Sequence, residues 1–321
     1  MRSVGALVSL VMVLHFGLGL AHGQETSGPL SAAAEHSLKP KDVFRECGEG
    51  CPEMVVVPAG AFTMGSPESE VGRGNNEGPQ HAVTIAHPFA VGKFHVTVDQ
   101  FAAFVKATHY DAGSSCYGWT GTKFEKREGW SWKDPGFAQS GTDPAVCLNW
   151  EDSKAYVAWL SQKTGKTYRL LSESEYEYAT RGGSRGRFFF GDDEAELCRY
   201  GNGADKTAKA EIPGGAGWTV VPCSDGYAYT SPGGSFAANS FGLYDMYGNA
   251  ISWLEDCYHG DYKGAPADGS AWTSGDCGRR VLRGGSWLGS PGYLRAADRG
   301  WDSSDYRSNY IGFRVARTLT P

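Results

Sequence analysis

The chain has 321 residues and a formal net charge of −6, with 45 glycines, 13% aromatic residues and only 21% charged residues. A nucleic-acid-binding surface needs a clustered positive excess, so the negative charge argues against a nucleic-acid partner. Glycine stands at about twice its usual share. Together with the aromatic residues, it favours a loop-rich globular protein held by aromatic packing and excludes a helical bundle.

The first residues have the pattern of an export signal, which we place at residues 1–23. Met1 and Arg2 give a positive start, the next stretch to Leu20 is almost free of polar side chains, and Ala21-His22-Gly23 offers small residues to a signal peptidase. An uncleaved membrane anchor is the alternative. No later segment is apolar over a bilayer-spanning length. We therefore expect a periplasmic or secreted protein without stable membrane insertion after signal cleavage.

Residues 24–50 are predicted to form a flexible lead-in, because the stretch to about Lys41 is polar, small and proline-containing. Ordered structure is expected to begin near Cys51. The runs Met54–Val57 and Ala82–Ile85 are short and β-prone, which predicts two early strands.

Two long helices follow in the middle of the chain. Thr97 and Gln100 have the spacing of a capping box in front of an apolar stripe, which predicts the start of a helix. Asn149 precedes a second helical pattern that runs to about Lys163, with Gly165 as its stop.

A third, short helix is predicted where Ser172 and Glu175 form another capping box, with its end at Gly182-Gly183. Beyond it the pattern is one of short strands and glycine-rich turns, without a long helix. No repeat and no linker divides residues 51–321, which we therefore treat as one domain.

Cysteine usage favours disulfides. An even number of cysteines in an exported chain points to an oxidising compartment. Because eight cysteines allow 105 pairings, the sequence does not fix the connectivity; the neighbour pairs Cys198–Cys223 and Cys257–Cys277 are the ones we expect. A metal cluster is the alternative, although no pair has the C-x-x-C spacing of a zinc site. The cysteines are Cys47, Cys51, Cys116, Cys147, Cys198, Cys223, Cys257 and Cys277.

Several stretches resemble, in order, those of the formylglycine-generating enzyme (sulfatase-modifying factor) family. The resemblance covers about Glu53 to Arg317 and implies an α+β fold, an extended C-type-lectin-like arrangement with low regular secondary structure. The stretches are Val57–Ser66, Pro79–Phe104, Asp143–Ser161, Arg169–Gly183, Gly242–Trp253, Arg280–Trp287 and Ile311–Arg317.

The resemblance does not extend to the family's chemistry. Its enzymes oxidise a cysteine of a sulfatase peptide to formylglycine, using oxygen and a copper ion held by two thiolates, the ligands that select Cu(I). In this chain Gly289 stands where the first cysteine belongs, the stretch from Ser290 to Tyr293 contains no sulfur, and no cysteine follows Cys277. Copper is therefore not expected. In having an export signal and no sulfur pair, the chain is similar to family members that act in the oxidative maturation of periplasmic products such as the pyoverdine chromophore.

The resemblance also implies structural calcium at two loop sites. At the first, Asn202 with Gly203 and Asp225 with Tyr227 match the family positions, the carbonyl groups coming from Gly203 and Tyr227. Oxygen ligands from two glycine-rich loops suit Ca²⁺. An ordinary Asp-Gly turn is the alternative.

The second calcium site departs from the family pattern. Asp245 stands where the family has asparagine, and Gly248 and Ala250 offer carbonyl groups. The usual glutamate of this motif is Ser252, a shorter and neutral ligand, so the affinity of this site for calcium should be lower.

The predicted pocket borders the glycine-containing segment that replaces the cysteines. Arg295 can pair with a ligand carboxylate; an internal salt bridge to Asp298 or Asp302 is the alternative. The polar segment Asp298–Asn309 is expected near the mouth of the pocket. The predicted wall residues are Ser286, Trp287, Tyr293, Arg295 and Trp253.

Three functions remain open. The first is a binding module for a peptide or small-molecule ligand, the second a maturation enzyme with a cysteine-independent mechanism, and the third formylglycine generation by an unrecognised route. A buried titratable group with a shifted pKa in the pocket would favour the second over the first. Glu255, Asp256 and His259 are candidates, unless they are simply solvated.

Overall fold

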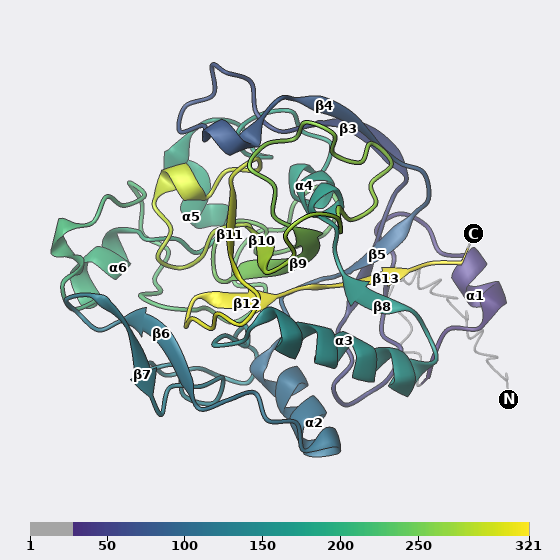
Figure 1. Cartoon of the computed structure of the whole chain (residues 1–321), viewed down its shortest axis with the longest axis horizontal. Helices are drawn as coiled ribbons and strands as arrows, with labels where there is room; N and C mark the ends of the chain where they lie inside the picture. Colours follow the sequence, from purple (N-terminus) through teal and green to yellow (C-terminus); the bar gives the residue numbers. More distant parts are fainter. Residues whose placement is uncertain (1–27, 321) are drawn as a thin grey trace, which may run out of the picture.

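The computed structural model describes residues 28–320 (Figure 1). The predicted export signal lies outside this range. Within it, no helix has both the length and the apolar character needed to cross a membrane. Helices and strands are mixed along the chain, which confirms the predicted α+β class.

Two sheets form the centre of the molecule. In the larger sheet every neighbouring pair of strands is antiparallel; its order is β1 (Val43–Phe44), β2 (Met54–Val57), β5 (Phe89–Gly92), β13 (Val315–Thr318) and β8 (Tyr168–Leu170). The smaller sheet has the order β11 (Arg299–Ser303), β10 (Arg279–Arg283), β9 (Ile251–Cys257) and β12 (Ile311–Phe313). Only the β9–β12 pair of this sheet is parallel.

Two hairpins lie outside these sheets. One pairs β3 (Gly60–Met64) with β4 (His81–Ile85), and the other pairs β6 (Ser115–Trp119) with β7 (Phe124–Glu128). The predicted strands at Met54–Val57 and Ala82–Ile85 correspond to β2 and β4.

Helices and short 3-10 turns surround the sheets. Helix α3 runs alongside β8 and β13, and α2 lies beyond it (Figure 1). The helices are α1 (Ala32–His36), α2 (Val98–Thr108), α3 (Trp150–Thr164), α4 (Glu173–Arg181), α5 (Leu197–Tyr200) and α6 (Lys206–Glu211). The 3-10 turns are η1 (Asn75–Glu77), η2 (Glu194–Glu196), η3 (Gly215–Gly217) and η4 (Pro291–Tyr293).

The three predicted helices begin and end where their caps indicate. The Oγ1 atom of Thr97 accepts a hydrogen bond from the Gln100 amide at 3.3 Å, and the Gln100 side chain accepts one from the Thr97 amide at 3.1 Å. The corresponding boxes at the starts of α3 and α4 are complete. Helices α3 and α4 end at Gly165 and Gly182, both in the left-handed conformation that favours glycine.

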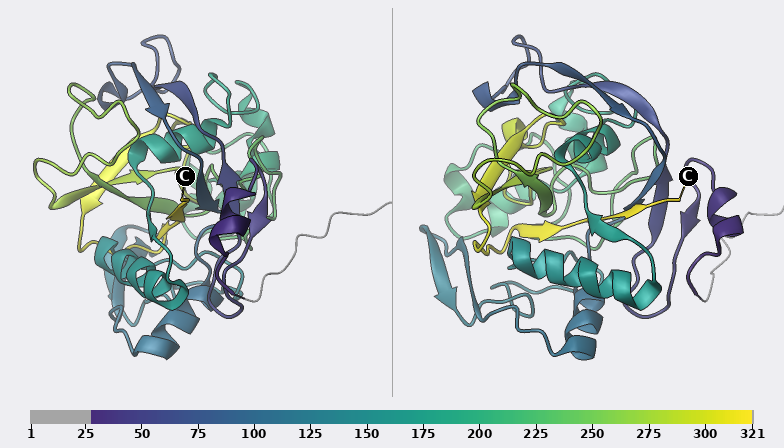
Figure 2. Two further views of the ribbon diagram at one scale, coloured as in Figure 1. Left: turned by 90° about the vertical axis from the view of Figure 1, so that its right-hand side faces the viewer. Right: turned by 45° about the vertical axis from the view of Figure 1, so that its right-hand side comes forward.

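The predicted flexible lead-in is ordered from residue 28 on, which corrects the expectation that order begins near Cys51. Glu35 of α1 is buried and accepts hydrogen bonds at 2.6 and 2.7 Å from Arg317. Glu46 is also buried, and its carboxylate accepts a hydrogen bond from the hydroxyl group of Tyr168 at 2.7 Å. Helix α1 therefore lies beside the C-terminal strand (Figures 1 and 2). A polar composition did not reveal this contact because its partner is 282 residues away.

All eight cysteines are paired. The bonds Cys198–Cys223 and Cys257–Cys277 confirm the two expected pairs, and Cys47–Cys51 and Cys116–Cys147 complete the set.

Candidate functional site

A cavity of about 310 Å³ opens beside the glycine-containing segment that follows β10. Four aromatic rings, one carboxyl group and the glycine-rich backbone form its wall. The lining residues are Phe124, Ile251, Gly285, Ser286, Leu288, Gly289, Tyr293, Asp298, Arg299, Gly300, Tyr306 and Tyr310.

Local backbone geometry explains why the wall needs glycine. Gly285 has a φ of +68°, and a Cβ atom there would lie 2.6 Å from the carbonyl oxygen of Tyr293. A larger residue would therefore push η4 away from the end of β10. The glycine allows these two segments to approach and to close one side of the cavity.

Asp298 is the titratable group of this cavity that is left without hydrogen-bond donors. Its side chain is 15% exposed and lies 3.7 Å from Nη2 of Arg295, beyond hydrogen-bonding distance, and no described residue donates a hydrogen bond to its carboxylate. Burial raises its pKa to about 7, and the charge of Glu77 adds to the shift, whereas Arg295 and Arg283 oppose it. A carboxyl group with this pKa can take up or release a proton near neutral pH.

Tyr306 and Tyr310 of the wall stay protonated at this pH, because the pKa of each is raised. Burial and the neighbouring Tyr310 raise the pKa of Tyr306. Its ring stacks on Tyr117 with the centroids 4.9 Å apart, while Tyr310 meets Phe124 edge-on at 6.0 Å. Tyr293 is 63% exposed and stands at the rim. The wall therefore offers aromatic faces and neutral hydroxyl groups to a ligand.

Two of the five predicted wall residues line the cavity, and three do not. Ser286 and Tyr293 line the cavity, as expected. Trp253 and Trp287 do not line it: both are fully buried, and their indole nitrogens donate to the carbonyl oxygens of Leu148 and Asn309. They belong to the core because each ring has both apolar contacts and a backbone acceptor there.

Arg295 forms an internal salt bridge, which was the alternative to a ligand contact, but its hydrogen-bonded partners are Glu70 and Glu77 and not the expected Asp298 or Asp302. Its guanidinium is buried and donates to Glu77 at 2.5 and 2.8 Å and to Glu70 at 2.6 Å. Burial alone would raise the pKa of Glu77, but the hydrogen bonds from Arg295 lower it. With its donors used in this way, Arg295 is not available to a ligand carboxylate.

None of the three acid–base candidates after Trp253 lines this cavity. Glu255 forms an ion pair with Lys154 at 2.7 Å, and the ring of His259 stacks on Trp272 at 3.5 Å. Asp256 is buried and accepts hydrogen bonds from two backbone amides, and burial raises its pKa to about 7. The sequence missed the role of Asp298, although the segment that begins there was expected near the mouth of the pocket.

Two oxygen atoms of the first predicted calcium site lack hydrogen-bond partners. Asn202 Oδ1 and Asp225 Oδ2 are buried and receive no hydrogen bond from the described residues, and the backbone of Gly203 lies against the Asp225 carboxylate. Tyr227 donates its amide to Asp225 at 2.8 Å, as in an ordinary Asx turn. Burial raises the pKa of Asp225 to about 7, and the charge of Asp205 contributes.

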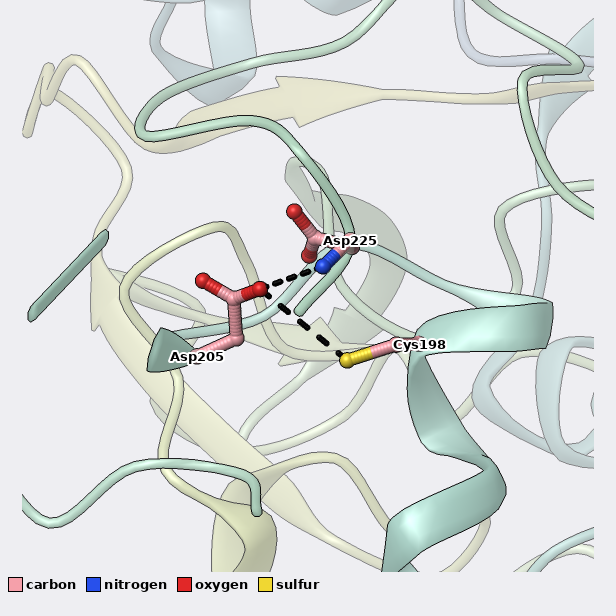
Figure 3. Close-up of side chains that lie close together, drawn as sticks. All are labelled: Cys198, Asp205 and Asp225. Carbon is pink, nitrogen blue, oxygen red and sulfur yellow. Dashed lines mark hydrogen bonds between the residues drawn. The ribbon is translucent and has the colours of Figure 1, made fainter. Parts of the chain in front are cut away.

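Asp205, which the sequence did not indicate, brings a second carboxylate to this site. It caps α6 and accepts the Asp225 amide at 2.5 Å, and it lies 4.0 Å from the Cys198 sulfur (Figure 3). That sulfur is bonded to Cys223 and is therefore not a thiolate ligand. Two adjacent carboxylates and a buried amide oxygen without donors fit a hard cation such as Ca²⁺.

The second predicted calcium site does not fit the ion as well. Asp245 is buried beside the Arg314 guanidinium, which donates to the Tyr244 carbonyl oxygen at 2.7 Å. Burial raises the pKa of Asp245 to about 6, and the charge of Arg314 opposes the shift. This arginine already places a positive charge beside Asp245, so a divalent ion would be repelled.

The remaining residues of that site have other surroundings. Ser252 is buried with its side chain beside that of Tyr176, while Gly248 donates its amide to the Gly284 carbonyl oxygen at 2.7 Å. The backbone of Ala250 lies against the ring of His95, whose pKa is lowered by burial and by Arg314. Ser252, where the resemblance implies a glutamate, thus belongs to a site that already contains the positive charge of Arg314.

Comparison with known proteins identifies the family. The model of the sulfatase-modifying factor enzyme 1-like domain matches residues 39–319, which is most of the chain. The chain belongs to this sulfatase-modifying factor family. A formylglycine-generating enzyme of Thermomonospora curvata is 32% identical to it, and the alignment covers 82% of this chain and 92% of that protein. An inactive Cα-formylglycine-generating enzyme 2 of Mus musculus is 30% identical, with 83% and 85% covered.

A solved structure is more similar still. PvdO from Pseudomonas aeruginosa shares 42% sequence identity with this chain and has a TM-score of 0.77, covering 88% of this chain and all of that one. The sulfatase-modifying-factor fold, with its extended C-type-lectin-like arrangement, is therefore confirmed. The relatives include both an active and an inactive formylglycine-generating enzyme, so family membership alone does not decide the activity.

Proposed function

We propose that this protein is an exported maturation enzyme of the sulfatase-modifying factor family that works without cysteine. It binds a peptide or small-molecule ligand in the aromatic cavity and exchanges a proton with it through Asp298. One observation carries the proposal: Asp298 lines an aromatic cavity, no residue within 28–320 donates a hydrogen bond to its carboxyl group, and the pKa of that group is raised to about 7. A titratable group with a shifted pKa at a cavity favours an enzyme over a binding module.

The cysteine pairing supports a mechanism without copper. The wall contains Gly289 where the family's first copper-binding cysteine is expected, and all eight cysteines of the chain are in disulfides. Copper(I) would need thiolates that this arrangement does not offer. Four disulfides also fit an oxidising compartment, which supports export.

An oxidative maturation step balances without a metal if dioxygen is the oxidant. The ligand loses two electrons and two protons. Dioxygen takes up the two electrons and the two protons and becomes hydrogen peroxide. Asp298 accepts one of these protons from an O–H or N–H group of the ligand and passes it on. The remaining wall groups orient the ligand and keep water away from it.

Structural calcium is a further part of the proposal. Asn202, Asp225 and Asp205 would hold the ion at the first site, with carbonyl groups of Gly203 and Tyr227 completing the ligand set. There the ion would balance the charges of two buried carboxylates. It would have no role in the proton transfer.

The test uses the native host, because the ligand is not identified. Extracytoplasmic extracts of a strain lacking the gene are incubated with the purified protein, and masses before and after are compared by mass spectrometry. We expect one compound to lose two hydrogen atoms with the wild type. The Asp298→Asn variant should leave it unchanged, whereas Asp302→Asn, on the same strand as Arg299 but outside the cavity, should convert it.

Two results would contradict the proposal. Conversion by Asp298→Asn at the wild-type rate would remove Asp298 from the chemistry. Binding of a compound without any change in its mass would favour the non-catalytic binding module, which the exposed rings of Tyr293 and Phe124 also suit. A Cys-x-Pro-x-Arg peptide with oxygen and copper tests formylglycine generation, and we expect no aldehyde.

A further inference from the structure

A second cavity, of about 250 Å³, adjoins the first. It shares Phe124 and Leu288 with the first cavity, so these two side chains form a common wall. Phe124 is 45% exposed, so neighbouring residues cover its ring only in part. The second cavity is lined by Trp119, Phe124, Ala204, Trp218, Thr219, Leu288 and Ser290.

The β6–β7 hairpin joins the two cavities through a row of aromatic rings. Trp119 and Phe124 face each other at the end of the hairpin, with ring centroids 5.5 Å apart. Trp218 continues the row at 5.7 Å from Trp119, and Tyr310 continues it on the other side at 6.0 Å from Phe124. Successive rings at this spacing form one apolar surface that reaches from the second cavity into the first.

The hairpin is held in place on this flank of the molecule. Nε1 of Trp119 donates to the carbonyl oxygen of Pro213, just after α6, at 2.7 Å. The hairpin and α6 accordingly lie side by side (Figure 1). The distance between the cavities is therefore set by contacts of the fold and does not depend on a bound ligand.

The two cavities leave one charged group, a carboxylate, available to a ligand. No residue that lines the second cavity is ionisable. In the first, the guanidinium of Arg299 is used internally: it donates to Glu173 at 2.6 and 2.7 Å and to the Asn76 carbonyl oxygen at 2.9 Å. Asp298 is the ionisable group that remains for a ligand, so a ligand anion would find a carboxyl group and no available cation.

We propose that the two cavities form one cleft for a ligand that carries two aromatic rings and, between or beside them, a cationic group that pairs with Asp298. One ring lies among Phe124, Tyr306 and Tyr310, and the other between Trp119 and Trp218. The inference extends the proposed function by naming the ligand class for its site, but it concerns binding only. A charge-assisted hydrogen bond to Asp298 and aromatic contacts at both ends would hold this ligand.

Short synthetic compounds test the ligand class. The probe is the acetylated tripeptide amide Tyr-Lys-Trp, and its variants replace Lys by Glu or Trp by Ala. Tyramine, which has one ring and one ammonium group, tests a small-molecule source. Dissociation constants are measured by calorimetry. We expect Tyr-Lys-Trp to bind about 10-fold more tightly than each of the other three, as one charge-assisted contact or one buried ring would give.

Matched variants assign the two contacts. The Asp298→Asn variant should bind the Lys and Glu peptides about equally and should still prefer the Trp peptide over the Ala peptide. The Trp218→Ala variant should bind the Trp and Ala peptides about equally and should still prefer Lys over Glu. Trp301→Ala removes an exposed ring on β11 outside both cavities and should change neither preference. Near-ultraviolet circular dichroism checks that each variant is folded.

Three outcomes would overturn the inference: tighter or equal binding of the Glu peptide, equal binding of tyramine and Tyr-Lys-Trp, or a Trp218→Ala variant that keeps the preference for Trp. The enzyme proposal is tested separately by conversion of the native compound. If the probes bind as expected while Asp298→Asn still converts that compound, the ligand class stands and the catalytic role of Asp298 fails.

Discussion

Asp298 differs from other buried acids of this chain in the position of its nearest arginine. Glu35 and Glu173 each accept two hydrogen bonds from a guanidinium, and each pKa is lowered as a result. Asp298 is 3.7 Å from Arg295, whose donors are used by Glu70 and Glu77. Burial therefore destabilises the ionised form of Asp298, and no hydrogen bond from a guanidinium offsets this effect. Such an environment is typical of functional acids.

This cost predicts a pH-dependent gain in stability on replacement of Asp298. Its pKa is about 7 in the folded state and 3.8 as the reference for the unfolded chain. Between these values the folded state binds more protons, so the free energy of unfolding falls as the pH rises. Asp298→Asn should be more stable than the wild type at about pH 8, by roughly 1–3 kcal/mol, and similar to it at about pH 4.

Denaturant unfolding of both proteins at the two pH values measures this difference. Arg295, Glu77 and Arg283 are the charged groups that influence Asp298, and none of them is changed by the substitution. A stability difference that is independent of pH would contradict the raised pKa. Replacement of the exposed Asp276 by Asn provides the comparison for a carboxyl group outside the cavity.

Arg295→Ala tests the structural role of this arginine. The substitution leaves Glu70 and Glu77 without their partner in a buried position, so we expect the free energy of unfolding to fall by about 3–5 kcal/mol. Arg199→Ala is the control, because its pair with Glu196 is exposed and 3.7 Å long, and should cost less than about 1 kcal/mol. Equal effects of the two substitutions in urea unfolding would show that the buried network contributes little.

At the scale of elements, the sequence predicts those helices whose stabilising contacts lie within a few residues. It does not predict elements that depend on contacts with a distant part of the chain. The caps at Thr97 and Ser172 predict their helices because both partners of each capping box are three residues apart, and Asn149 directly precedes the helical pattern of α3. Helix α1 escaped prediction because its stabilising contacts come from Arg317, which is 282 residues away from Glu35. Composition alone could not indicate a buried carboxylate in a polar stretch.

The docking of α1 yields a prediction for Glu35→Gln. The hydrogen bonds from Arg317 lower the pKa of Glu35 below its unfolded value of 4.5. Glu35 thus stabilises the fold fully above that pH, and this contribution is lost as the pH falls. We expect the substitution to lower the free energy of unfolding by about 2 kcal/mol at neutral pH, and by less in acid.

Chemical denaturation at pH values from neutral to acid follows this loss. Glu49→Gln serves as the control, since Glu49 is exposed and paired only with Lys106, and it should change the stability by less than about 1 kcal/mol. Equal changes in the free energy of unfolding for Glu35→Gln and Glu49→Gln would show that the ion pair between Glu35 and Arg317 does not stabilise the position of α1.

For the whole molecule, the sequence predicted the fold better than the site. The order of family segments indicates the architecture, and Ser286 and Tyr293 line the cavity as expected. Trp253 and Trp287 were misplaced because an aromatic residue beside a glycine turn has the same pattern in a wall and in a core. Phe124 was not foreseen, since its hairpin reaches the cavity from 161 positions before Gly285.

Calcium at the first site predicts a change in the stability of the whole protein. A ligand present at 100 times its dissociation constant stabilises the folded state by about 2.7 kcal/mol. A chelator should therefore lower the melting temperature of the wild type by several degrees, and Asp225→Asn should abolish the response to calcium. Asp276→Asn, outside the site, should respond as the wild type does. An unchanged melting temperature with the chelator would argue against calcium.

The position of β13 has a consequence for how the polypeptide acquires its fold. This strand, which ends at Thr318, lies between β5 and β8 in the larger sheet. Until it is in place, β5 and β8 each lack one neighbour, and their backbone amides and carbonyls remain unpaired. This sheet can therefore be completed only after residues 315–318 have been made, and a truncation just before Val315 would leave a gap between β5 and β8.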